Sequence, residues 1–204
     1  MKLSHRGRAP EPGRRERGAA LVELAIVAVI LVTMLGGAFD LGMAWRGTLA
    51  VTEGARAGVR VGSAVGVTKE ADRDLLLSVK SALSSSDMID KVVRIVVFRA
   101  GPNGRVPAEC KTATTLVSGC NILTGDDLRA LETTSPLEDN GCIKQSRSKG
   151  FCPTTRKDVP ASADSIGIWI RAEHPNLFPV MGRKRTIERT AVMRIEPRST
   201  EGTP

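Results

Sequence analysis

The sequence contains few of the residues from which active sites are built. It has only two histidines, His5 and His174, and it lacks the G-x-S-x-G, P-loop and H-E-x-x-H patterns. His5 lies in the basic N-terminal end, and we expect His174 to occupy a surface turn before Pro175. The paired acids at 126–127 and 138–139 lie in loop-like sequence, where we expect them to be solvated. The sequence therefore predicts a protein that is not an enzyme and that needs no cofactor.

Positive charge is concentrated at one end of the chain. Residues 1–18 contain six Lys or Arg residues and two Glu residues, a net +4 of the chain's +8. The high isoelectric point is thus largely a property of this segment. A basic end beside an apolar helix is typical of the cytoplasmic side of a membrane, and we expect no nucleic-acid partner.

A single apolar run is long enough to cross a bilayer. It extends from Ala19 to Trp45 and contains two charged residues, Glu23 and Asp40. At about 1.5 Å per residue the run spans about 40 Å, which exceeds the ~30 Å hydrocarbon core. A cleaved signal peptide has a shorter apolar region and no carboxylate at its start. We therefore expect a single-pass protein of the cytoplasmic membrane, with the N-terminus inside and the rest of the chain outside.

The two carboxylates lie near the two faces of the membrane. The uncharged stretch between them, residues 24–39, spans only about 24 Å. An ionisable group at this depth is costly and usually has a function. For Asp40 we expect pairing with Arg46 or a partner helix at the outer interface, or contact with water.

The head of the apolar run carries the motif Arg17-Gly18-Ala19-Ala20-Leu21-Val22-Glu23. A glycine ends the basic leader, and Glu23 is the fifth residue after it. This motif resembles the processing site of type IV prepilins, which a membrane peptidase cuts after the glycine. The resemblance implies a cut between Gly18 and Ala19, and a role for Glu23 in subunit assembly. The alternative is an uncleaved anchor in which Glu23 extends to the membrane interface.

The processing motif is chemically reasonable. Glycine lets the backbone enter a narrow protease site without a side chain in the way. The cut leaves one ammonium group on an apolar N-terminus. In a helical bundle that charge needs a partner, which a carboxylate on a neighbouring helix can supply.

Further stretches narrow the resemblance to one family. The run GAALVELAIVAVILVTMLGGAFDLGMAW, the following LAVTEGARAGVRVG and the C-terminal ERTAVMRIEP are similar to the TadE-like proteins. These are pseudopilins, or minor pilin-like proteins, of the tight-adherence (Flp pilus) machinery. The resemblance implies as partners a prepilin peptidase, other pilins or pseudopilins, and the pilus assembly platform.

Beyond the membrane, the helix is expected to continue to residue 62. Gly54, Gly58 and Gly62 recur every fourth residue and share one face. Small residues permit close approach of another element, so this face predicts a packing seam against a partner pilin or the protein's own sheet. The alternative is that the glycines only destabilise the helix, at about 1 kcal/mol each.

The remaining periodic segments predict a small α+β domain. Residues 69–84 are typical of an amphipathic helix with Leu75, Val79 and Leu83 on one face. Residues 92–98, 165–171 and 186–195 are predicted strands, the last two joined by a long connection. We expect a pilin-like antiparallel sheet packed on helices. The predicted segments are a cytoplasmic leader (1–18), a transmembrane helix (19–46), a helical extension with the amphipathic helix and first strand (47–99), a loop-rich disulfide segment (100–164), and the C-terminal strands and tail (165–204).

All four cysteines lie in the loop-rich segment, at Cys110, Cys120, Cys142 and Cys152. No C-x2-C pair occurs and no histidine is near, so a zinc site is not expected. An even number of cysteines outside the cytoplasm predicts disulfides. The two C-x9-C spacings favour the local pairs Cys110–Cys120 and Cys142–Cys152, and a nested arrangement is the main alternative.

Two functional hypotheses follow from the sequence. The first is a structural, TadE-like pseudopilin that is processed after Gly18 and assembled through its helix. The second is an uncleaved single-pass membrane protein whose extracytoplasmic, disulfide-stapled domain is a binding module.

Overall fold

A computed structural model describes residues 13–178 and 182–197, with side chains of the first helix from residue 18 onward. Most of the predicted leader, residues 1–12, lies outside the described residues. The described elements are α1 (Gly13–Val65), α2 (Ala71–Ser84), η1 (Ile89–Lys91), β1 (Val92–Arg99), α3 (Ala108–Thr112), β2 (Cys120–Thr124), α4 (Gly125–Arg129), β3 (Ser148–Lys149), η2 (Pro153–Thr155), β4 (Ser165–Pro175) and β5 (Lys184–Arg194).

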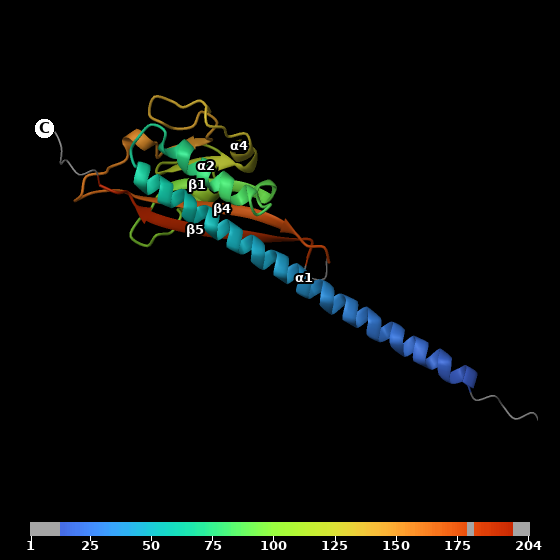
Figure 1. Ribbon diagram of the computed structural model, residues 1–204. Helices are drawn as coiled ribbons and strands as arrows, with labels where there is room; N and C mark the ends of the chain where they lie inside the picture. Colours follow the sequence, from blue (N-terminus) through green and yellow to red (C-terminus); the bar gives the residue numbers. More distant parts are fainter. Residues whose placement is uncertain (1–12, 179–181, 198–204) are drawn as a thin grey trace, which may run out of the picture.

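The first helix dominates the shape of the molecule. α1 is 53 residues long, which corresponds to about 80 Å, and its sequence contains no proline that would break it. Its N-terminal half projects away from the rest of the protein, while its C-terminal half lies along the sheet beside α2 (Figure 1). Within the described residues, α1 is the one helix that is long and apolar enough to cross a membrane.

The sheet has five antiparallel strands in the order β3-β2-β1-β4-β5. The three predicted strands form β1, β4 and β5, and β4 pairs with β5 along its whole length, from Ser165↔Arg194 to Pro175↔Lys184. The other two strands, β2 and β3, come from the loop-rich segment. They are five and two residues long, too short to produce a recognisable alternation in the sequence.

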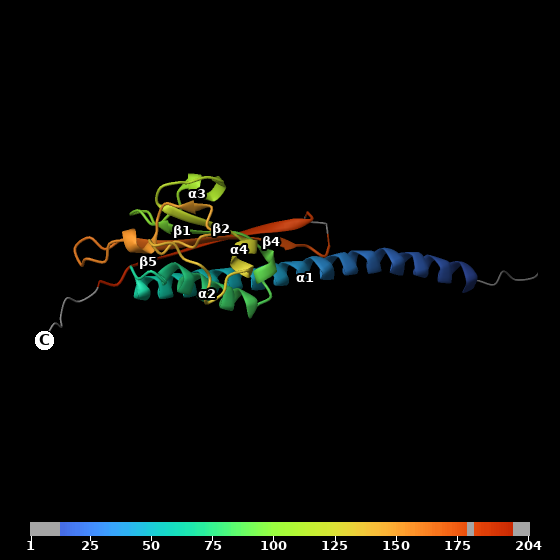
Figure 2. The ribbon, with the colours of Figure 1, turned by 90° about the horizontal axis from the view of Figure 1, so that it is seen from above.

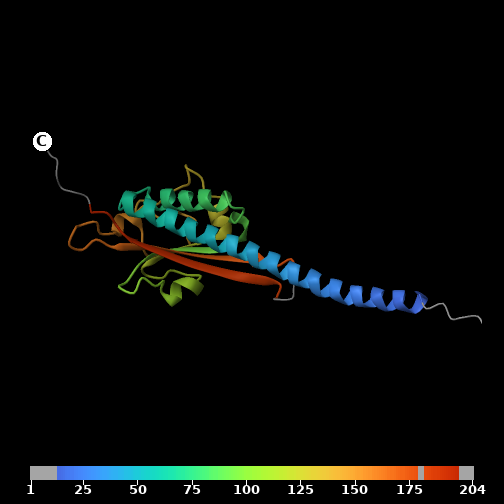
Figure 3. The same cartoon turned by 60° about the horizontal axis from the view of Figure 1, so that its bottom comes forward.

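Helices α1 and α2 cover one face of the sheet, and α3 lies on the other (Figures 2 and 3). The core between the sheet and the two helices confirms the predicted apolar face of α2, because Leu75, Val79 and Leu83 are fully buried there. Along β4, Ile168 points into this core and Trp169 into a second cluster with Phe98 on the opposite face. Because successive side chains of β4 point to opposite faces of the sheet, the strand contributes to two apolar layers.

The expected surface turn at His174 is wrong. His174 lies within β4, opposite Arg185 of β5, and is only 7% exposed. Pro175 is the last residue of the strand, a position that tolerates a missing backbone N–H. The proline therefore ends the strand after His174 and does not exclude the histidine from it.

Candidate functional site

The motif at the head of the apolar run lies on an exposed part of α1. Gly18, Ala19 and Glu23 are all exposed, and the helix passes through Gly18 without a break. A Cβ atom at Gly18 would meet nothing within 4 Å. Glu23 has no ion-pair or hydrogen-bond partner in the described part of the chain, so a partner for its carboxylate would have to come from elsewhere.

The helix segment after this motif exposes a large apolar surface. Its large side chains are 45–70% exposed, and they occur on every side of the helix. They are Leu21, Val22, Leu24, Ile26, Val27, Val29, Ile30, Leu31, Val32, Met34, Leu35 and Phe39. Soluble monomers rarely expose a contiguous apolar patch larger than a few hundred Å². This surface therefore belongs in a membrane or against other apolar helices.

Where the projecting segment meets the domain, Asp40 holds the connection between β4 and β5. Its Oδ1 accepts a hydrogen bond from the backbone N–H of Leu177 (3.0 Å), and its Oδ2 accepts one from that of Phe178 (2.8 Å). Asp40 is only 8% exposed. The expected contacts with Arg46, a partner helix or water are therefore wrong, since the carboxylate binds the protein's own hairpin. The long connection gives no sign of this contact in the sequence, because its partner lies 137 residues away.

A glycine one helical turn before Asp40 completes this contact. A Cβ atom at Gly36 would lie 2.7 Å from the ring of Phe178, closer than side chains tolerate. The aromatic ring thus lies directly on the helix backbone. Beside the connection of the same hairpin, Lys184 donates a hydrogen bond to Glu173 (2.5 Å) and thereby lowers the pKa of that carboxyl group.

The face of α1 formed by Gly54, Gly58 and Gly62 is covered by the protein's own elements. A Cβ atom at any of these positions would lie 2.4–3.2 Å from its nearest neighbour. Those neighbours are Leu83, Val79 and Leu75 of α2, and Ile168 and Ile166 of β4. The small residues let α1 approach α2 and the sheet closely. This face is therefore occupied within the chain.

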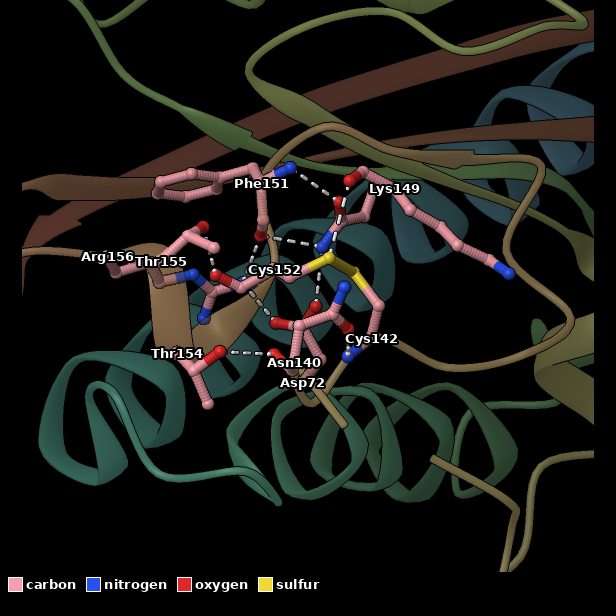
Figure 4. A network of polar contacts seen from close by, with 10 residues as sticks. Asp72, Asn140, Cys142, Lys149, Phe151, Cys152, Thr154, Thr155 and Arg156 are labelled. Atoms are coloured by element: carbon pink, nitrogen blue, oxygen red, sulfur yellow. Dashed lines mark hydrogen bonds and ion pairs between the residues drawn. A yellow bond between two sulfur atoms is a disulfide. The ribbon is translucent and has the colours of Figure 1, made fainter. Parts of the chain in front are cut away.

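The segment 100–164 contains two disulfides, and a buried polar network binds it to the rest of the domain. The disulfides join Cys110 to Cys120 and Cys142 to Cys152, which is the local pairing. Beside the second one, Arg156 forms an ion pair with Asp72 of α2, and both side chains are almost fully buried (Figure 4).

Asn121 of β2 joins this network to the strands. Its Nδ2 donates to Asp72 (2.6 Å) and to the carbonyl of Phe151 (2.7 Å), and its Oδ1 accepts from the N–H of Phe151 (2.9 Å). Arg156 also stacks on the Phe151 ring, 4.5 Å from its centroid. No sequence signal marks these residues, since they come from three separate segments. Through Asn121 of β2 and Arg156, they attach the disulfide-bonded segment to α2.

The paired acids of this segment also have structural partners. Asp127 closes a capping box with Thr124 at the start of α4, and Asp126 pairs with Arg129. Glu138 pairs with Lys149. The expectation that these acids are merely solvated is thus wrong for Asp127 and Glu138, because each contributes to local structure.

No metal centre is apparent in the described ranges. No group of three His, Cys, Asp or Glu side chains within these ranges could hold a metal ion. His174 lines a cavity of about 30 Å³ together with Arg46, Asp87 and Lys91. A cavity of that size has room for a water molecule and not for an organic substrate.

Comparison with known proteins adds one finding. The sequence model of the TadE-like protein family matches residues 18–60. The resemblance to the TadE-like family is confirmed. The TadE-like match begins at Gly18 and lies wholly within α1, so it includes Gly18 and Glu23 and none of the sheet. No curated protein and no solved structure matches the chain significantly. The TadE-like match and the exposed apolar helix together support a membrane protein related to the tight-adherence pilus.

Proposed function

We propose that this protein is a TadE-like pseudopilin, a structural component of tight-adherence pilus assembly or export. It is inserted with its N-terminus in the cytoplasm and trimmed between Gly18 and Ala19 by a prepilin peptidase. It then assembles through α1 with other pilins or pseudopilins and with the assembly platform. Its domain is extracytoplasmic, in agreement with the disulfides in segment 100–164.

The observation that carries this proposal is the projecting half of α1. A family match that starts at Gly18, an apolar surface exposed on all sides and a Glu23 without a partner among the described residues occur together at the same end of the helix. A simple anchor requires the apolar surface alone. An assembling pilin also requires a cleavable glycine and a carboxylate, and both are present at the spacing that the family uses.

Glu23 has a defined chemical task in this proposal. After cleavage the ammonium group of Ala19 lies in an apolar environment, where an unpaired charge is costly. In a staggered bundle, Glu23 of one subunit pairs with the N-terminus of a neighbour. The charge pair then sets the register between subunits, while the apolar surface supplies most of the contact area.

Processing is tested by determining the N-terminus of the membrane-extracted protein from cells that contain their own pilus machinery. We expect a terminus at Ala19, and we expect the Gly18→Val variant to keep its leader, because a branched side chain blocks entry of the backbone into the protease site. Gly13→Val is the matched control and should be cut normally. An intact leader in the unmodified chain, with the peptidase present, would instead favour the anchored binding module.

The role of Glu23 is tested separately in the same cells. We expect Glu23→Ala to be inserted and cut, yet to lose pilus assembly and co-purification of partner pilins. Glu53→Ala is the control, since Glu53 is an exposed acid on the same helix that only pairs with Arg56. Unchanged assembly in Glu23→Ala would exclude the proposed pairing.

A further inference from the structure

The connection between β4 and β5 carries apolar side chains at the end of the domain that faces the projecting helix. Leu177 is 69% exposed and Phe178 37% exposed, and Phe178 lies on Gly36 of α1. In Figure 1 this hairpin runs along α1 and ends where the helix leaves the domain. Leu177 and Phe178 therefore extend the apolar surface of α1 onto the neighbouring hairpin.

The length of the helix places the Phe178 ring at the depth of the hydrocarbon core. Gly36 is four residues before Asp40, hence about 6 Å deeper. If the hydrocarbon core ended before Gly36, the apolar run would span only about 26 Å even when counted from Ala19, with Glu23 included. Because the core is about 30 Å thick, it must include Gly36. The Phe178 ring, which contacts Gly36, then lies at the same depth.

Several described backbone groups next to the end of the hairpin have partners within the protein. An unpaired N–H in hydrocarbon costs several kcal/mol, so a loop at this depth needs internal partners. Asp40 accepts the N–H groups of Leu177 and Phe178, as described above. Asn176 donates its side-chain amide to the carbonyl of Gly182 (2.8 Å) and its backbone N–H to that of Arg183 (3.0 Å).

Polar and aromatic residues lie at the height expected for lipid headgroups. Trp45 and Arg46 are exposed on α1, about 8–9 Å beyond Asp40. On the hairpin, Arg183 and Arg185 flank Lys184, which itself pairs with Glu173. Tryptophan and basic side chains are favoured at the membrane interface, the latter through anionic lipids.

We propose that Leu177 and Phe178, which follow β4, insert into the outer leaflet and form a second membrane contact beside α1. The occupant is lipid: acyl chains at Leu177 and Phe178, and anionic headgroups at Arg183 and Arg185. The hairpin thereby fixes the domain close against the bilayer. This inference rests on the membrane anchor in the proposed function, but not on processing or on the role of Glu23.

The test uses the full chain, reconstituted in phosphatidylcholine–phosphatidylglycerol nanodiscs, with an environment-sensitive fluorophore on one added cysteine. Leu177→Cys reports on the tip. Leu116→Cys is the matched aqueous control, because Leu116 is equally exposed (71%) but lies in the connection between α3 and β2. Val32→Cys reports on the middle of the projecting helix. Each label is exposed to doxyl-labelled lipid and, separately, to aqueous iodide.

We expect lipid quenching at position 177 to reach at least half of that at position 32, with protection from iodide, while position 116 behaves in the opposite way. If position 177 behaves like position 116 while position 32 is quenched by lipid, the anchor stands and the hairpin contact is wrong. A tip label shielded from both quenchers would mean that protein, such as a second copy, covers it, which also contradicts the proposal. If position 32 escapes lipid quenching, the anchor fails and this inference fails with it.

Discussion

At the scale of single residues, the ion pair between Arg156 and Asp72 has the clearest energetic role. Both side chains are almost fully buried, so removing one of them leaves an uncompensated charge in the core. We expect Arg156→Met to lower the free energy of unfolding by about 3–5 kcal/mol. Urea unfolding of the detergent-solubilised chain, followed by fluorescence of the buried Trp169, measures this change.

A surface ion pair provides the control for this measurement. Arg56 pairs with Glu53 on α1, and both side chains are about two-thirds exposed. Water and side-chain entropy offset such a pair, so Arg56→Met should change stability by about 0.5 kcal/mol or less. Equal effects of the two variants would show that the buried network does not hold segment 100–164 in place.

The pKa of Glu173, beside the connection between β4 and β5, provides a prediction about pH. The hydrogen bond from Lys184 lowers the pKa of Glu173 below its usual value, so the ionised form is favoured in the folded protein. The resulting stabilisation is present above the unfolded pKa and is lost as the pH falls through the folded pKa. We expect Lys184→Met to raise the pKa of Glu173, measured by a carboxyl-carbon NMR titration. A pKa that does not rise would mean that Lys184 is not the cause.

At the scale of elements, the packing of α1 against α2 and the sheet depends on Gly58. A Cβ atom there would lie 2.4 Å from Ile168 Cδ1 and 2.5 Å from Val79 Cγ2. Overpacking typically costs about 1–3 kcal/mol, whereas the gain in helix propensity from Gly to Ala is about 1 kcal/mol. We therefore expect Gly58→Ala to lower stability by up to about 2 kcal/mol in the same urea unfolding experiment.

Gly42 is the matched control, because it lies in the same helix and a Cβ atom would meet nothing within 4 Å. Gly42→Ala should raise stability by up to about 1 kcal/mol. The opposite signs distinguish a packing seam from glycines that only weaken the helix. If both variants stabilise the protein, the seam does not need its glycines.

The elements that could be predicted from the sequence are those with a sustained period. The apolar run, the α2 stripe and the alternation in β4 each repeat over enough residues to indicate their structure. Strands β2 and β3 could not be predicted, because they are short and are stabilised by pairing with β1 and with each other. Their position depends on contacts such as Asn121–Asp72, which join residues 49 positions apart. Local pattern carries no information about such contacts.

Parts of the candidate site could also be predicted from the sequence. Gly18 and Glu23 form a local motif, so their spacing is visible in the sequence. Asp40 stands out in the sequence as a charge at the membrane face, but its partners come from a hairpin near the other end of the chain. The sequence misplaces His174 because Pro175 suggests a turn, whereas the strand extends to the proline.

At the scale of the whole molecule, α1 and the β4–β5 hairpin connect the membrane segment to the domain at two places. A single helix crossing into a domain could bend at the junction. Here the hairpin tip holds α1 at Gly36 and Asp40, below the point where the sheet begins to cover the helix. We infer that anchor and domain move as one body, so that forces on the helix within an assembly reach the sheet directly.

The contact between the hairpin and α1 depends on the carboxylate of Asp40. Asp40→Ala removes the acceptor of two backbone N–H groups, and a hydrogen bond to a charged group contributes about 1.5–3 kcal/mol. We expect amide hydrogen exchange at Leu177 and Phe178 to become at least about tenfold faster in membranes, since about 1.4 kcal/mol corresponds to a factor of ten. Exchange in the buried part of β4 should not change. Asp139→Ala, which removes an exposed carboxylate elsewhere on the domain, should alter neither region. Unchanged exchange at the tip in Asp40→Ala would show that the hairpin is held without this contact, and that anchor and domain are joined by α1 alone.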